Sequence, residues 1–239
     1  MAAARSSARE SGLVEAIGGF VVGLVLSSLT VTLAAAIAGY RLGSSRPVPV
    51  GVNIASEIGL WAGLVGGVVF YSRTRGSGHL GEDFGLAIRL PLDLLVGAAV
   101  GLATQLLLLP LLYLPFEQAD PTFRHRLEAP AKADTSAAHG GWQIALLLIF
   151  FAIGAPIVEE LFFRGLVLRS LGRWLGPVVG IAGSAVVFGL AHFELLQLPG
   201  LILFGVILGV LAWRTGRLGP GIVAHAAFNA VPVLTLTLH

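Results

Sequence analysis

The chain has no cysteine and little charge. The absence of cysteine excludes disulfide bonds, thiol catalysis and cysteine metal ligands. Charged residues make up 12% of the 239 residues, against roughly 25% in an ordinary globular domain. Hydrophobic residues make up 56%. We therefore expect a membrane protein.

Basic residues are too few and too dispersed to form a face for nucleic acid. The 15 lysines and arginines, nearly all of them arginine, lie at the edges of apolar runs. Such a distribution is typical of residues that mark membrane topology. The expected partner is the lipid bilayer, with no nucleic acid, and the richness in arginine, glycine and alanine favours a prokaryotic cell membrane.

Apolar runs recur along the whole chain. A membrane-crossing helix needs roughly 20 apolar residues, and the sequence predicts an all-α, polytopic membrane helical bundle of about seven transmembrane helices. The expected spans are about 13–38, 50–72, 94–116, 140 to beyond 158, 176–193, 198–213 and 218–238.

The first apolar run is longer than the ~7–15 residues of a signal-peptide core, so we interpret it as a retained span. Residues 1–12 are expected to form a polar N-terminal tail, and residues 13–239 a single transmembrane domain.

Two longer polar segments, 73–90 and 117–139, interrupt the apolar runs. The second contains Pro121, Pro130 and charges of both signs, and it is predicted to be an exposed loop. Glu15 and Asp93 lie at the ends of apolar runs, where we interpret them as snorkelling toward the membrane surface.

Polar side chains inside the predicted spans concentrate in the C-terminal third of the chain. Such groups are rare within membranes and are usually functional. Glu57, in the second span, is interpreted as a water-facing or hydrogen-bonded residue, with an interior functional carboxylate as the less favoured alternative. The C-terminal set comprises Glu159, Glu160, Arg164, His192, His225 and Asn229.

A spacing of four residues recurs in this set, and residues so spaced share one face of a helix. Three helices can therefore each present a polar face toward one interior point. The pairs are Glu160 and Arg164, Phe188 and His192, and His225 and Asn229.

A helix break at Gly176-Pro177 would bring two of these faces together. The break lies midway between Glu159 and His192. A turn there places both residues at one level, each roughly 25 Å from the turn at ~1.5 Å rise per residue. His225 lies only a few residues after the next turn, so we expect it to be shallower or in a tilted helix.

This set of side chains permits hydrolysis of an amide. A glutamate and a histidine that face each other can hold a water molecule and take its proton, and a second histidine with an asparagine can stabilise an oxyanion. Glu159, His192 and His225 could instead bind zinc, which takes about three protein ligands plus water in catalytic sites. Glu160 and Arg164 would form a supporting ion pair or a clamp on a substrate carboxylate.

The three motifs, in this order, resemble the CAAX protease and bacteriocin-processing family of intramembrane proteases, which is related to the type II CAAX prenyl endopeptidase. The family signature is Glu-Glu-x-x-x-Arg, then Phe-x-x-x-His, then His-x-x-x-Asn, and the similarity covers about residues 140–235. The resemblance implies an intramembrane endopeptidase that acts on a membrane protein or peptide. Family members are described as metalloproteases and also as metal-free enzymes, so the resemblance leaves the cofactor open between Zn²⁺ and none.

The resemblance also implies a role for each residue of the set. Glu159 would be the general base and His192 its partner on the catalytic water. The oxyanion site would consist of His225 and Asn229. The supporting or substrate-orienting residues would be Glu160 and Arg164.

Two other functions fit parts of the sequence. A non-catalytic membrane scaffold, or a bacteriocin-immunity-type protein, would need the same helices without the water-activating pair. A transporter or channel would use the buried charges as an ion path. The chain shows no paired inverted halves, and its intramembrane charges are confined to the C-terminal part, so transport is the weaker alternative.

Overall fold

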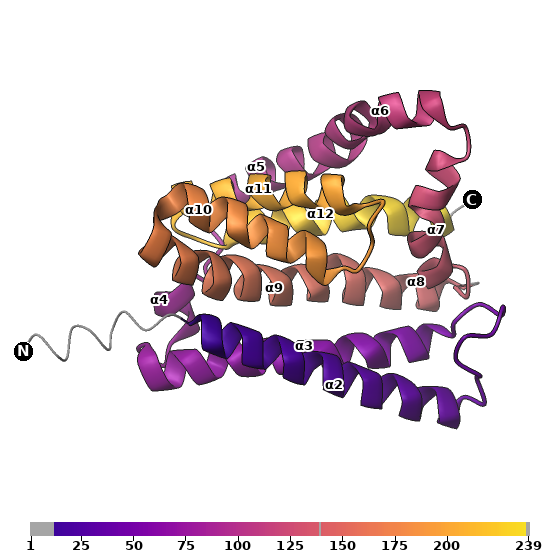
Figure 1. Cartoon of the computed structure of the whole chain (residues 1–239), viewed down its shortest axis with the longest axis horizontal. Helices are drawn as coiled ribbons and strands as arrows, with labels where there is room; N and C mark the ends of the chain where they lie inside the picture. Colours follow the sequence, from indigo (N-terminus) through magenta and orange to yellow (C-terminus); the bar gives the residue numbers. More distant parts are fainter. Residues whose placement is uncertain (1–11, 139, 238–239) are drawn as a thin grey trace, which may run out of the picture.

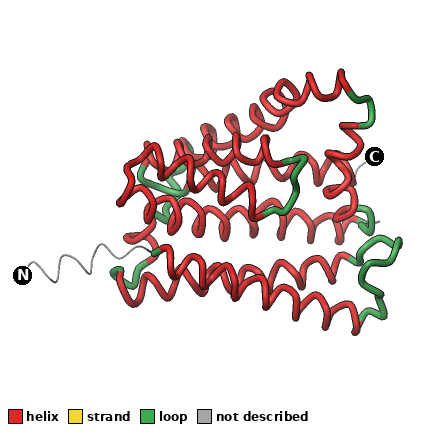
Figure 2. Tube along the Cα trace, viewed as in Figure 1, coloured by secondary structure: helices red, strands yellow, loops and turns green. Residues whose placement is uncertain are grey.

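The structure is a computed structural model that describes residues 12–138 and 140–237. All secondary structure in these ranges is helical, as Figure 2 shows, and the predicted all-α class is confirmed. The expected polar tail, residues 1–12, lies almost entirely outside the described residues.

The bundle consists mostly of two helical hairpins and a long tilted helical stretch (Figure 1). The hairpins comprise residues 13–75 and 141–191, and the tilted stretch comprises residues 92–119. The N-terminal half contains α2 (Leu13–Ile37), α3 (Val50–Arg75), α4 (Leu80–Phe84), α5 (Leu92–Ala103), the π-helical η1 (Thr104–Leu108), α6 (Leu109–Ala119) and α7 (Phe123–Thr135). The C-terminal half contains α8 (Gly141–Leu147), the π-helical η2 (Leu148–Gly154), α9 (Ala155–Glu159), the π-helical η3 (Glu160–Val167), α10 (Leu168–Ala191), α11 (Leu198–Thr215) and α12 (Gly219–Thr237).

Six helical stretches are long and apolar enough to cross a membrane, compared with about seven predicted. The difference arises in Gly141–Ala191, which counts as one stretch of 51 residues. The chain nevertheless reverses within it at Gly176, whose φ of 83° and ψ of 170° are not helical. A Cβ on Gly180 would lie 2.8 Å from the Cα of Gly172, so the two arms pack closely after the turn. The predicted fourth and fifth spans are therefore both present.

Glycines allow α2 and α3, which form the first hairpin, to pack closely against each other. A Cβ on Gly63 would lie 2.1 Å from the backbone nitrogen of Gly23, and one on Gly67 would lie 2.7 Å from the Glu15 carbonyl. In a bilayer, where lipid is as apolar as a leucine side chain, close approach through small residues is a main source of helix association. The hairpin therefore depends on glycine at these positions.

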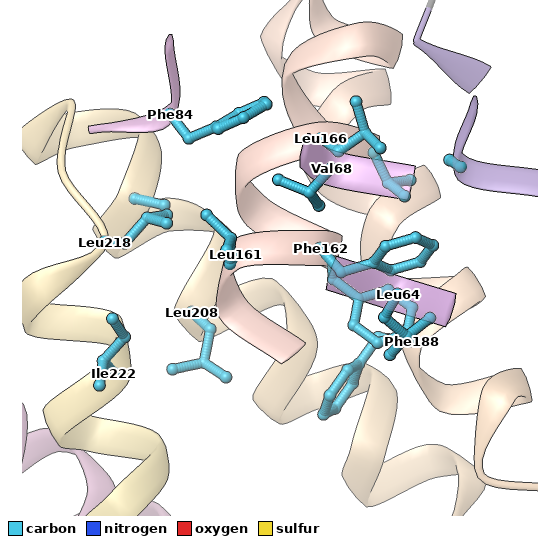
Figure 3. Close-up of a cluster of buried hydrophobic side chains, with 14 of the residues drawn as sticks. Leu64, Val68, Phe84, Leu161, Phe162, Leu166, Phe188, Leu208, Leu218 and Ile222 are labelled. Carbon is cyan, nitrogen blue, oxygen red and sulfur yellow. The ribbon is translucent and has the colours of Figure 1, made fainter. Parts of the chain in front are cut away.

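The segment η3 lies at the centre of the bundle, and all eight of its residues are buried. Figure 3 shows its Leu161, Phe162 and Leu166 among side chains of α3, α4, α10, α11 and α12. Long π-helical segments are uncommon and often occur at functional sites. Here the segment carries Glu160 and Arg164 into the core.

The predicted exposed loop at 117–139 is wrong, because residues 123–135 form the helix α7. Glu128 lies one turn from both Arg124 and Lys132, and its carboxylate is 3.4 Å from Arg124 Nε and 3.0 Å from Lys132 Nζ. Such pairs stabilise a helix. Pro130 lies inside α7, where it removes one backbone donor without ending the helix.

The snorkelling interpretation of Glu15 and Asp93 is also wrong. Glu15 is 7% exposed and Asp93 is 1% exposed. The Glu15 carboxylate is 2.8 Å from Arg75 Nε, and Asp93 accepts a 2.9 Å hydrogen bond from Arg217 Nη2. Each carboxylate is therefore paired with an arginine from another part of the chain, which no local pattern predicts.

Candidate active site

A cavity of about 420 Å³ brings together four of the six residues that the sequence singled out. Its lining includes Glu159 from α9, His192 at the end of α10, and His225 and Asn229 from α12. The turn at Gly176 makes this possible, because it returns the chain so that His192 reaches the side of the bundle that carries Glu159. The predicted convergence of three helices on one interior point is confirmed for these residues.

Glu160 and Arg164 lie behind the cavity and not in its lining. Both side chains are 0% exposed, and Arg164 Nη1 is 2.9 Å from Glu160 Oε1. Arg164 Nη2 donates a hydrogen bond to the Gly205 carbonyl, and its guanidinium lies 4.3 Å from the centre of the Phe188 ring. This placement fits a supporting ion pair and leaves neither residue within reach of a substrate carboxylate in the cavity.

His225 links the two adjacent glutamates. Its Nδ1 is 3.2 Å from Glu160 Oε1, and its Nε2 is 3.9 Å from Glu159 Oε2. The rings of Phe188 and Phe204 stand nearly perpendicular to the imidazole, with centroids 5.7 Å and 5.4 Å away. The expectation that His225 lies shallower than the glutamates is therefore wrong, because α12 carries it to their level.

His192 has a defined tautomer. Its Nδ1 lies 2.8 Å from the carbonyl oxygen of Phe188, one turn earlier. A carbonyl oxygen can only accept, so Nδ1 carries the proton and donates it. In the neutral ring, Nε2 is then left with a lone pair that can accept a hydrogen bond from water.

Asn229 is anchored by its amide nitrogen, which donates a 2.9 Å hydrogen bond to the Phe151 carbonyl. An asparagine amide has two N–H donors. One donor therefore fixes the side chain, and the other is available to a ligand in the cavity.

Glu159 carries an oxygen with free hydrogen-bonding capacity. Its Oε2 is buried and has no hydrogen-bond partner among residues 12–138 and 140–237. A buried oxygen without a donor is costly. It is satisfied when a proton donor such as water or a substrate enters the cavity, which is the behaviour needed of a general base.

The candidate zinc ligands do not form a metal site. No three histidine, aspartate or glutamate side chains in the described parts of the chain come close enough to share an ion. A catalytic zinc needs about three protein ligands at roughly 2.0–2.2 Å. Glu159, His192 and His225 line one cavity without meeting that geometry, and we assign no step of the reaction to a metal.

Three further carboxylates line the same cavity: Glu57 from α3, Asp134 from α7 and Glu194 from the loop after α10. Sequence reasoning singled out Glu57 without favouring a function for it, and it placed Asp134 in a loop. Their common location depends on α7 packing across one end of the bundle (Figure 1). The only sequence feature that could have predicted these carboxylates in the lining is a lone carboxylate in an apolar span, and Glu57 has that feature.

The surroundings of Asp134 in the cavity raise the pKa of its carboxyl group. Desolvation at the cavity, together with the negative charge of Glu194, raises the pKa of Asp134 from 3.8 to about 6. The residue as a whole stays exposed, so solvent screens part of this effect. The direction reflects desolvation first and the nearby charge of Glu194 second.

Comparison with known proteins identifies the region that carries the site. Residues 141–231 match the family model described as type II CAAX prenyl endopeptidase Rce1-like. No significant match was found among curated proteins or among solved structures. The matched region contains all six motif residues and confirms the family resemblance seen in the sequence. The chain is a multi-pass membrane protein, and its residues 141–231 are similar to the Rce1-like type II CAAX prenyl endopeptidases.

Proposed function

We propose that the chain is an intramembrane endopeptidase in which Glu159 activates water to hydrolyse a peptide bond. The observation that carries this proposal is the buried, unsatisfied Oε2 of Glu159 in a cavity that it shares with two histidines and an asparagine. The family match supports protease activity as the class of reaction. The substrate is a membrane protein or a membrane-bound peptide, because the cavity lies inside a helical bundle that spans the bilayer.

In the first step, Glu159 takes a proton from water while His192 Nε2 accepts the second water hydrogen and orients the oxygen. The water oxygen forms a bond to the carbonyl carbon, and the carbonyl oxygen becomes an oxyanion. In the second step, Glu159 delivers the proton to the amide nitrogen and the C–N bond breaks. The products are a carboxylic acid and an amine, which become a carboxylate and an ammonium group when the acid passes its proton to the amine.

Asn229 and His225 stabilise the oxyanion. Asn229 uses the N–H that is not bonded to Phe151. His225 directs Nδ1 to Glu160, so it must donate from Nε2 as an imidazolium. Glu159 and Glu160 stand on the two sides of that ring and stabilise its positive charge.

Glu160 and Arg164 act as positioning residues. Because the Glu160 carboxylate contacts both Arg164 and His225, it fixes the imidazole and thereby the direction of Nε2. The arginine-, glycine- and alanine-rich composition supports a prokaryotic cell membrane as the location.

Reconstitution of the purified protein in liposomes with membrane-anchored peptides tests this function. We expect mass spectrometry to detect cut peptides with the native chain and with Glu82→Gln, which removes an exposed carboxylate on α4. Glu159→Gln should lower the rate by roughly 10²–10⁴-fold, the usual contribution of a general base. Full activity of Glu159→Gln in a correctly inserted protein would exclude the proposal and favour a non-catalytic scaffold.

A further inference from the structure

Carboxylates of the helical bundle fall into two groups, one buried and the other half-buried or exposed, and the groups differ in their partners. Outside the cavity, Glu15, Asp93 and Glu160 each face an arginine, with contacts at 2.8 Å, 2.9 Å and 2.9 Å. Inside the cavity, Glu57, Asp134 and Glu194 form no ion pair with any lysine or arginine of residues 12–138 and 140–237. The three cavity carboxylates therefore lack the arginine partner that each of the buried carboxylates has.

The cavity carboxylates act on one another. Glu57 interacts electrostatically with Glu159 and with Asp134, and Asp134 interacts with Glu194. The four groups therefore form a connected series from the proposed general base to the residues at the α7 end of the cavity. Like charges in a medium of low dielectric repel strongly, and four carboxylates against two histidines give the cavity an acidic lining.

Apart from histidine, the lining contains no residue that could neutralise this charge. Its charged members are the four carboxylates, and neither lysine nor arginine contributes to the wall. His225 is 3% exposed and already faces Glu160. Together with the unpartnered Oε2 of Glu159, these features indicate an occupant that brings hydrogen-bond donors and positive charge into the cavity.

We infer that the cavity selects a peptide with a lysine or arginine side chain close to the scissile bond, and that Glu57 is the residue that receives it. This inference rests on the proposed function, since it concerns the substrate of the same site. Glu57 is the suited residue because it lines the same cavity as Glu159 from another helix, α3, and has no lysine or arginine partner in the described residues. Asp134 and Glu194 attract the same cation as the peptide enters.

The physical reason for selectivity is the missing counter-charge. A cationic side chain in the cavity converts repelling carboxylates into charge-assisted hydrogen bonds, which are about twice as strong as neutral ones. A neutral side chain of the same length would leave Glu57 desolvated and unpaired. Sites whose buried polar groups are left unpaired by an analogue reject that analogue strongly.

The test uses two membrane-anchored, alanine-rich peptides that differ at one position, with lysine in one and norleucine in the other. The native protein in liposomes should cleave the lysine peptide with the higher kcat/KM. Glu57→Gln should reduce the lysine-to-norleucine ratio by roughly tenfold or more, the effect of one hydrogen bond to a charged group. Glu82→Gln, which removes a carboxylate outside the cavity, should keep the native ratio.

Binding separates this inference from the proposed function. The Glu159→Gln variant should bind the lysine peptide more tightly than the norleucine peptide, measured by fluorescence of a label on the peptide, and the additional change Glu57→Gln should remove that preference. Equal affinity for the two peptides would overturn the inference, even where cleavage by the native chain upholds the endopeptidase. A lysine preference without any Glu159-dependent cleavage would uphold cation selection and overturn the endopeptidase.

Discussion

The arginine-paired carboxylates and the cavity carboxylates show two ways in which this bundle treats negative charge: the first group is buried beside a cation, and the second is half-buried or exposed without one. Glu160 is completely buried with Arg164 beside it, and Asp93 is covered with Arg217 beside it. Glu57 lies in an equally apolar span but faces a cavity and has no such partner in the described residues. A buried charge is tolerated when it is paired, so an unpaired one indicates that function outweighs stability at that position.

The largest expected effect comes from breaking the central pair. Glu160→Ala leaves the Arg164 guanidinium uncompensated at 0% exposure, which should lower the free energy of unfolding by about 3–5 kcal/mol. Thermal unfolding in detergent micelles measures the change. The double variant Glu160→Leu with Arg164→Met removes both charges and should recover much of the loss. If it were as unstable as the single variant, charge pairing would not be the cause.

Breaking the pair at the edge of the bundle should have a smaller effect. Asp93→Ala removes the partner of Arg217, whose side chain keeps 14% exposure and can turn toward solvent. The expected loss is about 1.5–3 kcal/mol, the range for a hydrogen bond to a charged group. The same micelle measurement checks it, and a loss equal to that of Glu160→Ala would contradict the role given to solvent exposure.

Removing a carboxylate from the cavity should have the opposite effect on the free energy of unfolding. Glu57→Gln removes a carboxylate that its neighbours repel, so it should raise the unfolding free energy, by roughly 1 kcal/mol. The midpoint of thermal unfolding, compared with that of Glu82→Gln, measures the gain. A clear loss of stability in Glu57→Gln would mean that Glu57 has a structural partner and belongs with the paired group.

The smallest expected effect is a dependence of stability on pH that originates at Asp134. The folded protein holds the pKa of this group near 6, above its ordinary 3.8, so between about pH 4 and 6 the folded state binds more protons than the unfolded state. Stability should therefore fall as pH rises through this window, by less than about 1 kcal/mol because Asp134 is exposed. Asp134→Asn should remove this part of the slope in unfolding curves recorded at several pH values.

The sequence predicted those parts of the site that depend on local spacing. Glu160 and Arg164 share a helix face because they are four residues apart, and the structure pairs them. The helix break at Gly176-Pro177 was readable because glycine and proline rarely continue a helix, and it returns His192 to the cavity. Hydrophobic run length was enough to locate the spans, since the bilayer imposes a minimum helix length.

Contacts between distant segments were not predictable in this way. The position of His225 depends on how α12 packs against α5, η2 and α9, and no count of residues from a turn gives that arrangement. Glu57 and Asp134 share a cavity only because α7 forms a helix and packs against α3 and α12, a fold that the prolines in this segment concealed. Long-range pairs such as Asp93 with Arg217 are set by tertiary packing alone.

The most direct test of the account is peptide cleavage by the reconstituted protein, with and without the Glu159 carboxylate. The account predicts that the native chain and Glu82→Gln cut membrane-anchored peptides at the same sites, with and without a metal chelator, and that Glu159→Gln inserts and unfolds normally but cuts roughly 10²–10⁴-fold more slowly. Unchanged cleavage by Glu159→Gln would contradict it.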